Sequence, residues 1–497
     1  MHPSPSPLSL LLRLFAALLI AGLPFLLGDA RAATASAKPP NFLVVLVEGM
    51  GFSDAGCYGG EFQTPYLDYL ASRGLRFTQA YHPSGPDCAE GVLLTGFYPQ
   101  HGLMPPENRD NPGSGSSAVH ARPAWLRLLP SLLQAAGYRS YYSGVWSLGG
   151  MSGEADFEGY FDYGAANKAG QGDSVPDRVA ERACEFLQDH KARAAGKPFF
   201  SFVRLPRAPE KRPAATTADQ RGGIFEGGRE AISRLRLERL WTMGMLLNAE
   251  LPNVASSISG GDPVARPEAQ NAEFQRRMEL QADHVSWVDA QMGRLLEQVK
   301  ALGWWENTVV CFLSEPSAGP PPPPEPWYSR IPVHAPLRES DCGLHEGGIA
   351  TPLVVHWPAG IRARGETREQ FVHVVDLAPT LLKIAGVAWP KKLGSLTVPG
   401  SDGVDLTPVL RENKIPASRP LWWFHAGSRA FRLGDWKWLS PRGKPVELYY
   451  LKEDRSEMRD VAEVNYERVK EMEVQWTRMA GRFQADSEGP GAKTNGH

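Results

Sequence analysis

Two glutamates follow apolar runs, at the positions where α/β proteins bind their ligands. Glu48 follows the apolar run from Asn41 to Val47, and Glu315 comes two residues after the run from Thr308 to Leu313. Ligands of such sheets bind beyond the carboxyl ends of the strands, and carboxylates at that edge can contact a cation. Two solvated glutamates at strand ends are the simpler alternative, and the residues alone leave both open.

The segment around Cys88 offers a nucleophile. Asp87 and Glu90 have the N-cap and N3 spacing of a capping box, which predicts that a helix begins here and leads into the apolar residues 92–94. Cys88 then lies in the first turn, where the helix dipole favours a thiolate while the two carboxylates oppose it. We therefore interpret Cys88 as structural rather than catalytic.

Four apolar runs predict the buried strands that would position these residues. They are Asn41 to Val47, Phe199 to Val203, Thr308 to Leu313 and Pro352 to Trp357. Between the second and third, apolar residues recur at three- and four-residue steps over 285–299, which predicts one face of a long helix. The alternation predicts an α/β domain whose mostly parallel sheet is covered by helices on both faces.

The pattern changes at about Gly400. Short aromatic strands are predicted at 421–425, 429–439 and 447–451, followed by a helix over 461–483. We therefore divide the chain into an N-terminal α/β domain, 39–399, a smaller C-terminal α+β domain, 400–484, and a disordered polar tail, 485–497. Two stretches, 108–123 and 208–267, interrupt the α/β pattern and are expected to be insertions, the second with a helix around 229–247.

Composition excludes some classes of partner. The chain has 497 residues with 42% hydrophobic content, which is enough for a large core. Its formal net charge is -2, so neither nucleic acid nor an anionic membrane is an expected partner.

The first 32 residues have the pattern of a secretory signal peptide. Arg13 closes a weakly charged segment, an apolar run covers 14–27, and Ala30-Arg31-Ala32 offers a cleavage site. A membrane anchor is the alternative, but spanning a bilayer takes about 20 apolar residues and this run is shorter. The mature chain is therefore expected to be exported, to the periplasm or the medium.

Motifs along nearly the whole chain resemble the sulfatase family, in the family's order. They are 40–60 with 64–81, Leu93-Leu94-Thr95-Gly96 with Tyr98-Pro99, Gly144-x-Trp146-x-Leu148-Gly149, 304–310, Glu346-Gly347-Gly348-Ile349, 375–381, Gly434-Asp435-Trp436-Lys437 and Glu447-Leu448-Tyr449. The resemblance implies a two-domain member of the alkaline phosphatase superfamily. It also implies hydrolysis of sulfate esters with calcium and a formylglycine, an aldehyde made from cysteine in a Cys-x-Pro-x-Arg motif.

The nucleophile motif departs from the family. Counting back from Leu93 puts Pro86 where the cysteine belongs and Glu90 where the arginine belongs. Aligning on Cys88 instead leaves Ala-Glu-Gly-Val where the family has x-Pro-x-Arg. Formylglycine is therefore not expected.

The metal ligands and cations depart as well. The family's paired aspartates become Glu48-Gly49, and its later Asp-Asn or Asp-His becomes Glu315-Pro316. Calcium takes six to eight oxygen ligands, so two side chains where the family supplies four predict a weak site at most and more simply no cofactor. The family's lysine and histidine around Trp146 are replaced by valine and Ser147. Asp341 replaces another lysine, and Arg207 replaces a histidine.

We therefore predict a sulfatase-fold pseudoenzyme with a binding or regulatory role. Its pocket would gather Glu48, Asp87, Glu90, Glu315 and Asp341 against one arginine, and would repel sulfate. An acidic pocket favours a cationic small molecule, and exposed tryptophans would favour a carbohydrate. A homodimer, or pairing with an active sulfatase, stays open.

The alternative is an active sulfuric ester hydrolase, or another ester hydrolase, with a rearranged site. Cys88 or Ser84 would be its nucleophile. His82 and His345 would be its acid or base, because each lies beside a family motif.

Overall fold

The computed structural model describes residues 38–85, 88–101, 123–148, 156–168, 176–208, 225, 227–246, 248–251, 267–315, 336–338, 343–414 and 419–488. Within the chain, residues from Pro40 onward form one compact unit. The predicted signal peptide, Asp87 and Asp341 lie outside the described residues.

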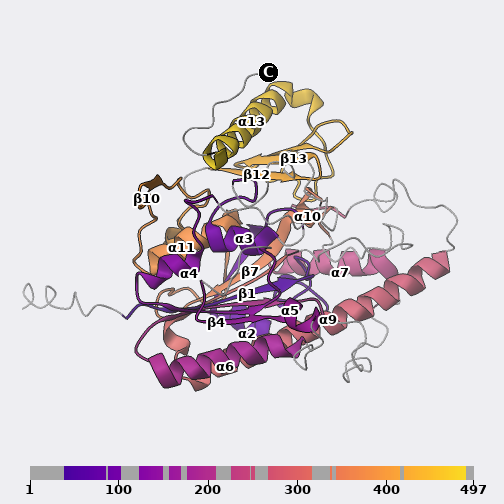
Figure 1. Ribbon diagram of the computed structural model, residues 1–497. Coiled ribbons are helices and arrows are strands. Elements are labelled where there is room, and N and C mark those ends of the chain that lie inside the picture. Colours follow the sequence, from indigo (N-terminus) through magenta and orange to yellow (C-terminus); the bar gives the residue numbers. More distant parts are fainter. Residues whose placement is uncertain are drawn as a thin grey trace, which may run out of the picture. The chain divides into compact units, whose positions relative to one another are not determined.

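A nine-stranded sheet forms the centre of this unit (Figure 1). Its order is β4-β3-β5-β1-β6-β7-β2-β8, with β9 also paired to β2. The strands are β1 (Asn41–Glu48), β2 (Leu75–Tyr81), β3 (Arg139–Gly144), β4 (Gly159–Asp162), β5 (Phe199–Leu205), β6 (Thr308–Glu315), β7 (Ala350–His356), β8 (Glu366–Arg368) and β9 (Val372–His373). Only the pairings of β7 with β6 and β2 are antiparallel, which confirms the predicted mostly parallel sheet.

Helices cover both faces of the sheet, as Figure 1 shows. One face carries α2 (Pro65–Arg73), α6 (Asp177–Ala194), α7 (Gly228–Thr242) and α9 (Pro267–Ala301), and the other carries α3 (Cys88–Thr95), α4 (Leu129–Gln134) and α11 (Leu377–Ile384). Alternate residues of β1 enter the two cores: Leu43 and Val45 pack with the first set, Phe42 and Val44 with the second. This is why the strand reads as an unbroken apolar run.

The remaining short elements connect these layers. They are α5 (Tyr163–Lys168), α10 (Glu346–Ile349), α12 (Thr407–Glu412), the 3₁₀ turns Gly56–Tyr58, Trp305–Asn307, Val374–Asp376 and Glu463–Asn465, and the hairpin β10 (Lys392–Leu393) and β11 (Leu396–Thr397). The predicted long helix is α9, which is confirmed and begins earlier than its apolar face. The helix expected around 229–247 is α7, which ends at Thr242.

Helix α7 is fixed by a buried arginine. Arg236 is fully buried, its Nη2 lies 2.7 Å from Glu61 and its Nη1 lies 3.0 Å from Asp54. Both acids belong to the connection between β1 and α2, so the ion pairs tie the predicted insertion to the carboxyl end of β1.

The C-terminal part is a four-stranded antiparallel sheet with one helix. Its elements are β12 (Pro420–His425), β13 (Ser428–Leu433), β14 (Trp436–Ser440), β15 (Glu447–Tyr450) and α13 (Tyr466–Glu488). The prediction of one strand over 429–439 is wrong, because Gly434 takes a positive φ of 60° and turns the chain into a hairpin. Helix α13 also continues into the predicted tail, as far as Glu488.

Most tryptophans belong to the interior rather than to the surface. Trp422, Trp423 and Trp438 are buried in the C-terminal sheet, and Trp476 of α13 stacks on Trp422 with ring centroids 5.1 Å apart. Among the described tryptophans only Trp241 is clearly exposed, at 45%.

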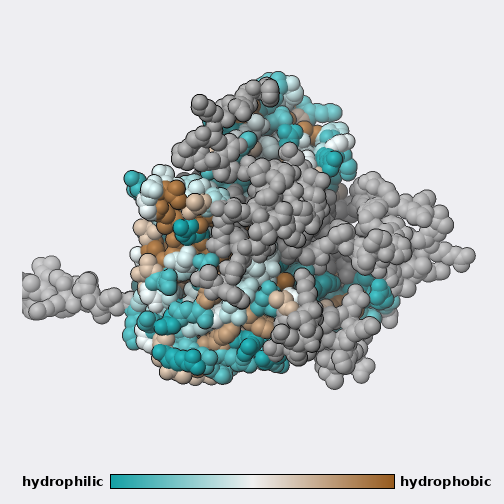
Figure 2. All heavy atoms as spheres, in the orientation of Figure 1, coloured by the Kyte–Doolittle hydropathy of each residue, from teal (hydrophilic) through white to brown (hydrophobic). Residues whose placement is uncertain are grey.

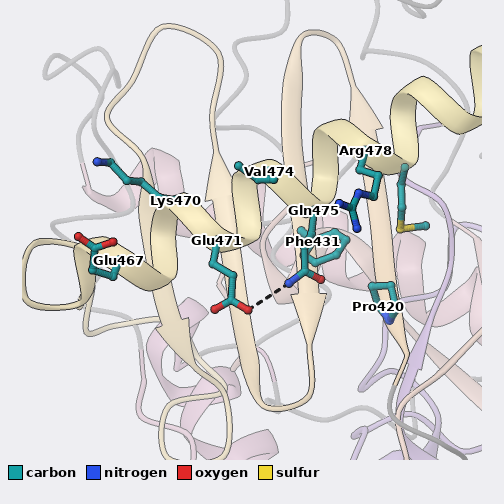
Figure 3. Close-up of a pocket in the computed structure, with 9 residues that line it drawn as sticks. Pro420, Phe431, Glu467, Lys470, Glu471, Val474, Gln475 and Arg478 are labelled. Carbon is teal, nitrogen blue, oxygen red and sulfur yellow. Dashed lines mark hydrogen bonds between the residues drawn. The ribbon is translucent and has the colours of Figure 1, made fainter.

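On the face drawn in Figure 2, hydrophobic residues gather beside β10 and α11, where Leu396 is exposed. In the part of the chain that the structure describes, no helix is both long and apolar enough to cross a bilayer.

Candidate functional site

The first two predicted site residues lie side by side at the carboxyl edge of the sheet. Glu48 ends β1 and Glu315 ends β6, and the two are register partners in this parallel pair. Glu48 is half-buried, whereas Glu315 is 1% exposed. The Gly49 amide donates to the Glu315 carbonyl at 2.9 Å, which holds the two strand ends together.

The cation at this edge is Arg204, near the end of β5. Its Nη2 lies 2.6 Å from Glu315 Oε1, and its Nε donates to the same oxygen at 2.8 Å. Its Nη1 lies 3.6 Å from Glu90 Oε2 and donates to the Val145 carbonyl at 2.7 Å. Arg204 is 1% exposed, so one guanidinium spans two buried carboxylates inside the protein.

Glu90 completes this buried cluster. Its Oε2 accepts a hydrogen bond from the Ser147 amide at 2.8 Å and another from the Ser147 hydroxyl. The capping box predicted for Asp87 and Glu90 stays a prediction, because Asp87 lies outside the described residues. Burial raises the pKa of Glu90, and the Arg204 charge opposes that rise.

Two side chains of helix α9 hold the backbone at the end of β1 by hydrogen bonds. His284 Nε2 lies 2.8 Å from the Glu48 carbonyl, and the Gln281 amide donates to the Gly49 carbonyl at 2.9 Å. Burial lowers the pKa of His284 to about 3, so its ring is neutral and donates through Nε2. The backbone that presents Glu48 is thus fixed by two side chains of one helix.

Arg207, the arginine that the sequence placed in the pocket, is not part of the buried cluster but contacts Gln281 of α9 near the end of β1. It is exposed, and its Nη2 donates to Gln281 Oε1 at 3.2 Å. The structure therefore brings Glu90, Ser147 and Glu315 together around Arg204, with Glu48 beside Glu315.

The two histidines of the alternative reading each have a close partner. His82 Nδ1 lies 2.6 Å from the Pro83 carbonyl, and His345 Nε2 lies 2.9 Å from Glu447 Oε2 in β15. Ser84 donates to the Gly343 carbonyl at 3.3 Å. All three side chains are therefore hydrogen-bonded within the protein.

Cys88 is the first residue of α3 and is half-buried. It faces the same space as His425, the last residue of β12. A Cβ atom at Gly85 would lie 2.8 Å from His425 Nδ1 and 3.6 Å from Cys88 Sγ. Gly85 has φ of +101°, so glycine is favoured there both by conformation and by the close approach of His425.

The nine-stranded sheet, the site at its carboxyl edge and the second antiparallel sheet define the alkaline-phosphatase-like class of α/β fold. The chain belongs to the sulfatase family, because the family model described as Sulfatase matches residues 40–387.

Individual relatives extend the match beyond this region. An uncharacterized sulfatase of Schizosaccharomyces pombe is 25% identical over 526 residues, covering 89% of this chain and 93% of the relative. An arylsulfatase of Klebsiella aerogenes is 25% identical, covering 77% and 94%. The solved structure of Ps i-CgsB in complex with k-i-k-neocarrahexaose shares the fold, with a TM-score of 0.62, 20% identity and coverage of 92% and 96%.

The described residues include only some of the positions at which the resemblance implies calcium ligands. Of these positions, Glu48 and Glu315 supply carboxylates, and Glu315 is already bonded to Arg204. Calcium needs six to eight oxygens, whereas a guanidinium offers only donors and a like charge. Within the described residues, no three His, Cys, Asp or Glu side chains are grouped so that they could hold a metal ion.

Sequence reasoning missed Arg204, although a signal was present. Arg204 is the one charged residue in the run Phe199–Leu205, which is otherwise apolar apart from Ser201. A charged residue inside a buried strand requires a partner of opposite charge. That requirement points to the acids that follow neighbouring strands.

Proposed function

We propose that this chain is an exported sulfatase-family protein that has lost formylglycine- and calcium-dependent hydrolysis of sulfate esters and has a binding or regulatory role. The observation that carries the proposal is the pairing of Arg204 with Glu315, at 2.6 Å and inside the protein. Family membership is established by the match over residues 40–387, whereas the loss of activity is our inference.

The pairing argues against calcium on electrostatic grounds. Two positive charges about 4 Å apart repel by roughly 4 kcal/mol for each pair of unit charges at an effective dielectric constant of 20. A divalent ion on Glu315 would meet twice that repulsion from Arg204. The guanidinium supplies one positive charge to the two buried carboxylates of Glu90 and Glu315, which weakens their attraction for a metal ion.

The residues around Cys88 also argue against sulfatase activity. Cys88 is followed by Ala89 and Glu90 rather than by the residues of the maturation motif, and Glu90 is engaged with Ser147 and Arg204. The alternative, an ester hydrolase with a rearranged site, needs an acid or base. Its candidates His82 and His345 are each engaged with a structural partner, so we favour the inactive reading.

A carbohydrate or a cationic small molecule is the ligand class we propose. Half-buried Glu48 is the carboxylate best placed to meet an amine or a hydroxyl group. The solved relative Ps i-CgsB was captured with k-i-k-neocarrahexaose, which supports a carbohydrate. Because the described tryptophans are mostly internal, recognition would rest on hydrogen bonds more than on aromatic stacking.

Export is part of the proposal. If residues 1–32 are a signal peptide, N-terminal sequencing of the protein from its own host should give a mature chain that begins at Ala33. A chain that begins at Met1 would contradict export by cleavage.

Two measurements on the mature protein test the loss of activity. Isothermal titration with calcium should give no stoichiometric binding, and p-nitrophenyl sulfate should be hydrolysed no faster than by the Arg204→Met variant. The Klebsiella aerogenes arylsulfatase serves as the positive control for hydrolysis. Calcium binding at one site per chain, or turnover that the variant loses, would contradict the proposal.

A further inference from the structure

Six buried side chains join the C-terminal sheet to the main sheet. Two belong to the α/β part, Tyr81 at the end of β2 and Glu346 in α10. Four belong to the C-terminal part: Arg432, Lys437, Arg455 and Glu457. None is more than 5% exposed, and we call the set the interdomain lock.

Glu346 is the centre of the interdomain lock. Its Oε1 accepts from Lys437 at 3.1 Å, and its Oε2 accepts from Tyr81 at 2.7 Å and from Arg455 at 3.1 Å. Arg432 in turn donates to the Tyr81 hydroxyl. Burial opposes ionisation of Glu346, but these cations lower its pKa to about 2.

Glu457 contacts both Glu346 and Lys437 within the interdomain lock. Its Oε2 accepts from the Glu346 amide at 2.6 Å, and its Oε1 lies 2.8 Å from Lys437 Nζ. Its backbone has φ of +57°, a left-handed conformation that costs a residue with a side chain about 1 kcal/mol. The chain tolerates this strain where the Glu457 carboxylate meets Lys437.

Apolar packing also crosses this junction, where Trp423 packs on Tyr81 with ring centroids 5.6 Å apart, so the buried charges add to an apolar contact. Charges buried between two parts are stable only when every partner is in place, and removing one partner costs about 3–5 kcal/mol. Docking of the C-terminal part should therefore be sensitive to single changes in the interdomain lock that leave the shared apolar core intact.

Segment 343–349 links the interdomain lock to the candidate site. His345 lies 2.9 Å from Glu447 of β15, and the Gly343 carbonyl accepts from Ser84. The C-terminal sheet thus fixes a segment that contacts the nucleophile region of the family fold.

We propose that the interdomain lock makes the C-terminal sheet a separately opening unit, whose docking holds segment 343–349 against Ser84. Opening would leave the nine-stranded sheet folded while it exposes β12 to β15 and frees α10. This inference does not depend on whether the chain hydrolyses sulfate esters.

Native-state hydrogen exchange of the full chain tests this, with Lys437→Met as the variant. We expect amides of β12 to β15 to exchange on the order of a hundredfold to a thousandfold faster, as the loss of a buried partner implies. Amides of β1, β5 and β6 should stay within a fewfold of the wild type. Arg429→Met is the control, because the Arg429 pair with Glu473, at 3.5 Å, lies within the C-terminal part.

If Lys437→Met does not fold, a second variant, Glu457→Gly, tests the same proposal. Glu457→Gly relieves the positive φ, so it should be neutral or stabilising if only backbone conformation matters. We expect instead the same selective exchange in β12 to β15. Exchange that matches the Arg429→Met control, or that rises equally in β1 and β13, would overturn the proposal.

Discussion

Arg204 Nη2 lies 2.6 Å from Glu315 Oε1, and both side chains are 1% exposed. Arg204 comes from β5 and Glu315 from β6, the two strands that flank β1. The guanidinium therefore spans the strand edge that carries Glu48 and Glu315, and neutralises part of its acidic charge.

Replacing Arg204 should be strongly destabilising. In Arg204→Met, the carboxylates of Glu315 and Glu90 stay buried without their cation, so we expect the free energy of unfolding to fall by about 3–5 kcal/mol. Urea denaturation measures the difference. Arg207→Met is the matched control, because Arg207 is exposed and should change stability by less than about 0.5 kcal/mol.

A double substitution separates charge from packing. Arg204→Met with Glu315→Met removes both partners, which is often nearly neutral in buried pairs. We expect it to recover more than half of the single-variant loss. No recovery would show that Arg204 contributes through packing or through its bond to Val145.

Removing the Arg204 guanidinium should allow an external cation to bind in its place. In Arg204→Ser, Glu90 and Glu315 lose the guanidinium that they share, so millimolar calcium should raise the melting temperature by a few degrees. The wild-type protein should not respond. A calcium response of equal size in both proteins would mean that Arg204 does not take the place of the metal.

Asp289 of α9 should give the protein a pH dependence of known sign. It accepts from the Leu67 amide at 2.8 Å and the Tyr66 amide at 3.2 Å, at the start of α2. Burial raises its pKa from 3.8 to about 6. Because the folded state binds the proton more tightly, the free energy of unfolding should decrease as pH rises from about 4 to about 6.

The Asp289→Asn variant tests this sign. It should lack that part of the decrease, a difference of at most about 3 kcal/mol across the window. Urea titrations at several pH values measure both proteins. Parallel curves would contradict the raised pKa.

The sequence predicted the sheet better than it predicted the site. Strand and helix periodicity identified β1, β5, β6 and α9, because these elements bury continuous apolar faces. The strand over 429–439 was wrong because Gly434 alone does not distinguish a hairpin turn from a glycine inside a strand. Arg204 was missed because its partners, Glu90 and Glu315, are more than a hundred residues away in sequence.

A side chain at position 85 should destabilise the protein. Alanine there would place a Cβ atom 2.8 Å from His425 Nδ1, in a conformation with φ of +101°. We expect Gly85→Ala to cost about 1–3 kcal/mol and to shift the His425 resonances in a two-dimensional NMR spectrum. Gly137→Ala is the control, since φ is also positive there but no atom lies within 4 Å. Equal costs at the two positions would mean that the contact with His425 contributes nothing.

The chemical state of Cys88 tests the central claim most directly. Mass spectrometry of the peptide that carries Cys88, from protein exported by its own host, should show an unmodified thiol. Glu90→Pro with Val92→Arg rebuilds Cys-x-Pro-x-Arg after Cys88, and its aldehyde would show that the host can mature this chain. A thiol in the wild-type protein supports an inactive member of the sulfatase family, whereas an aldehyde there would contradict it.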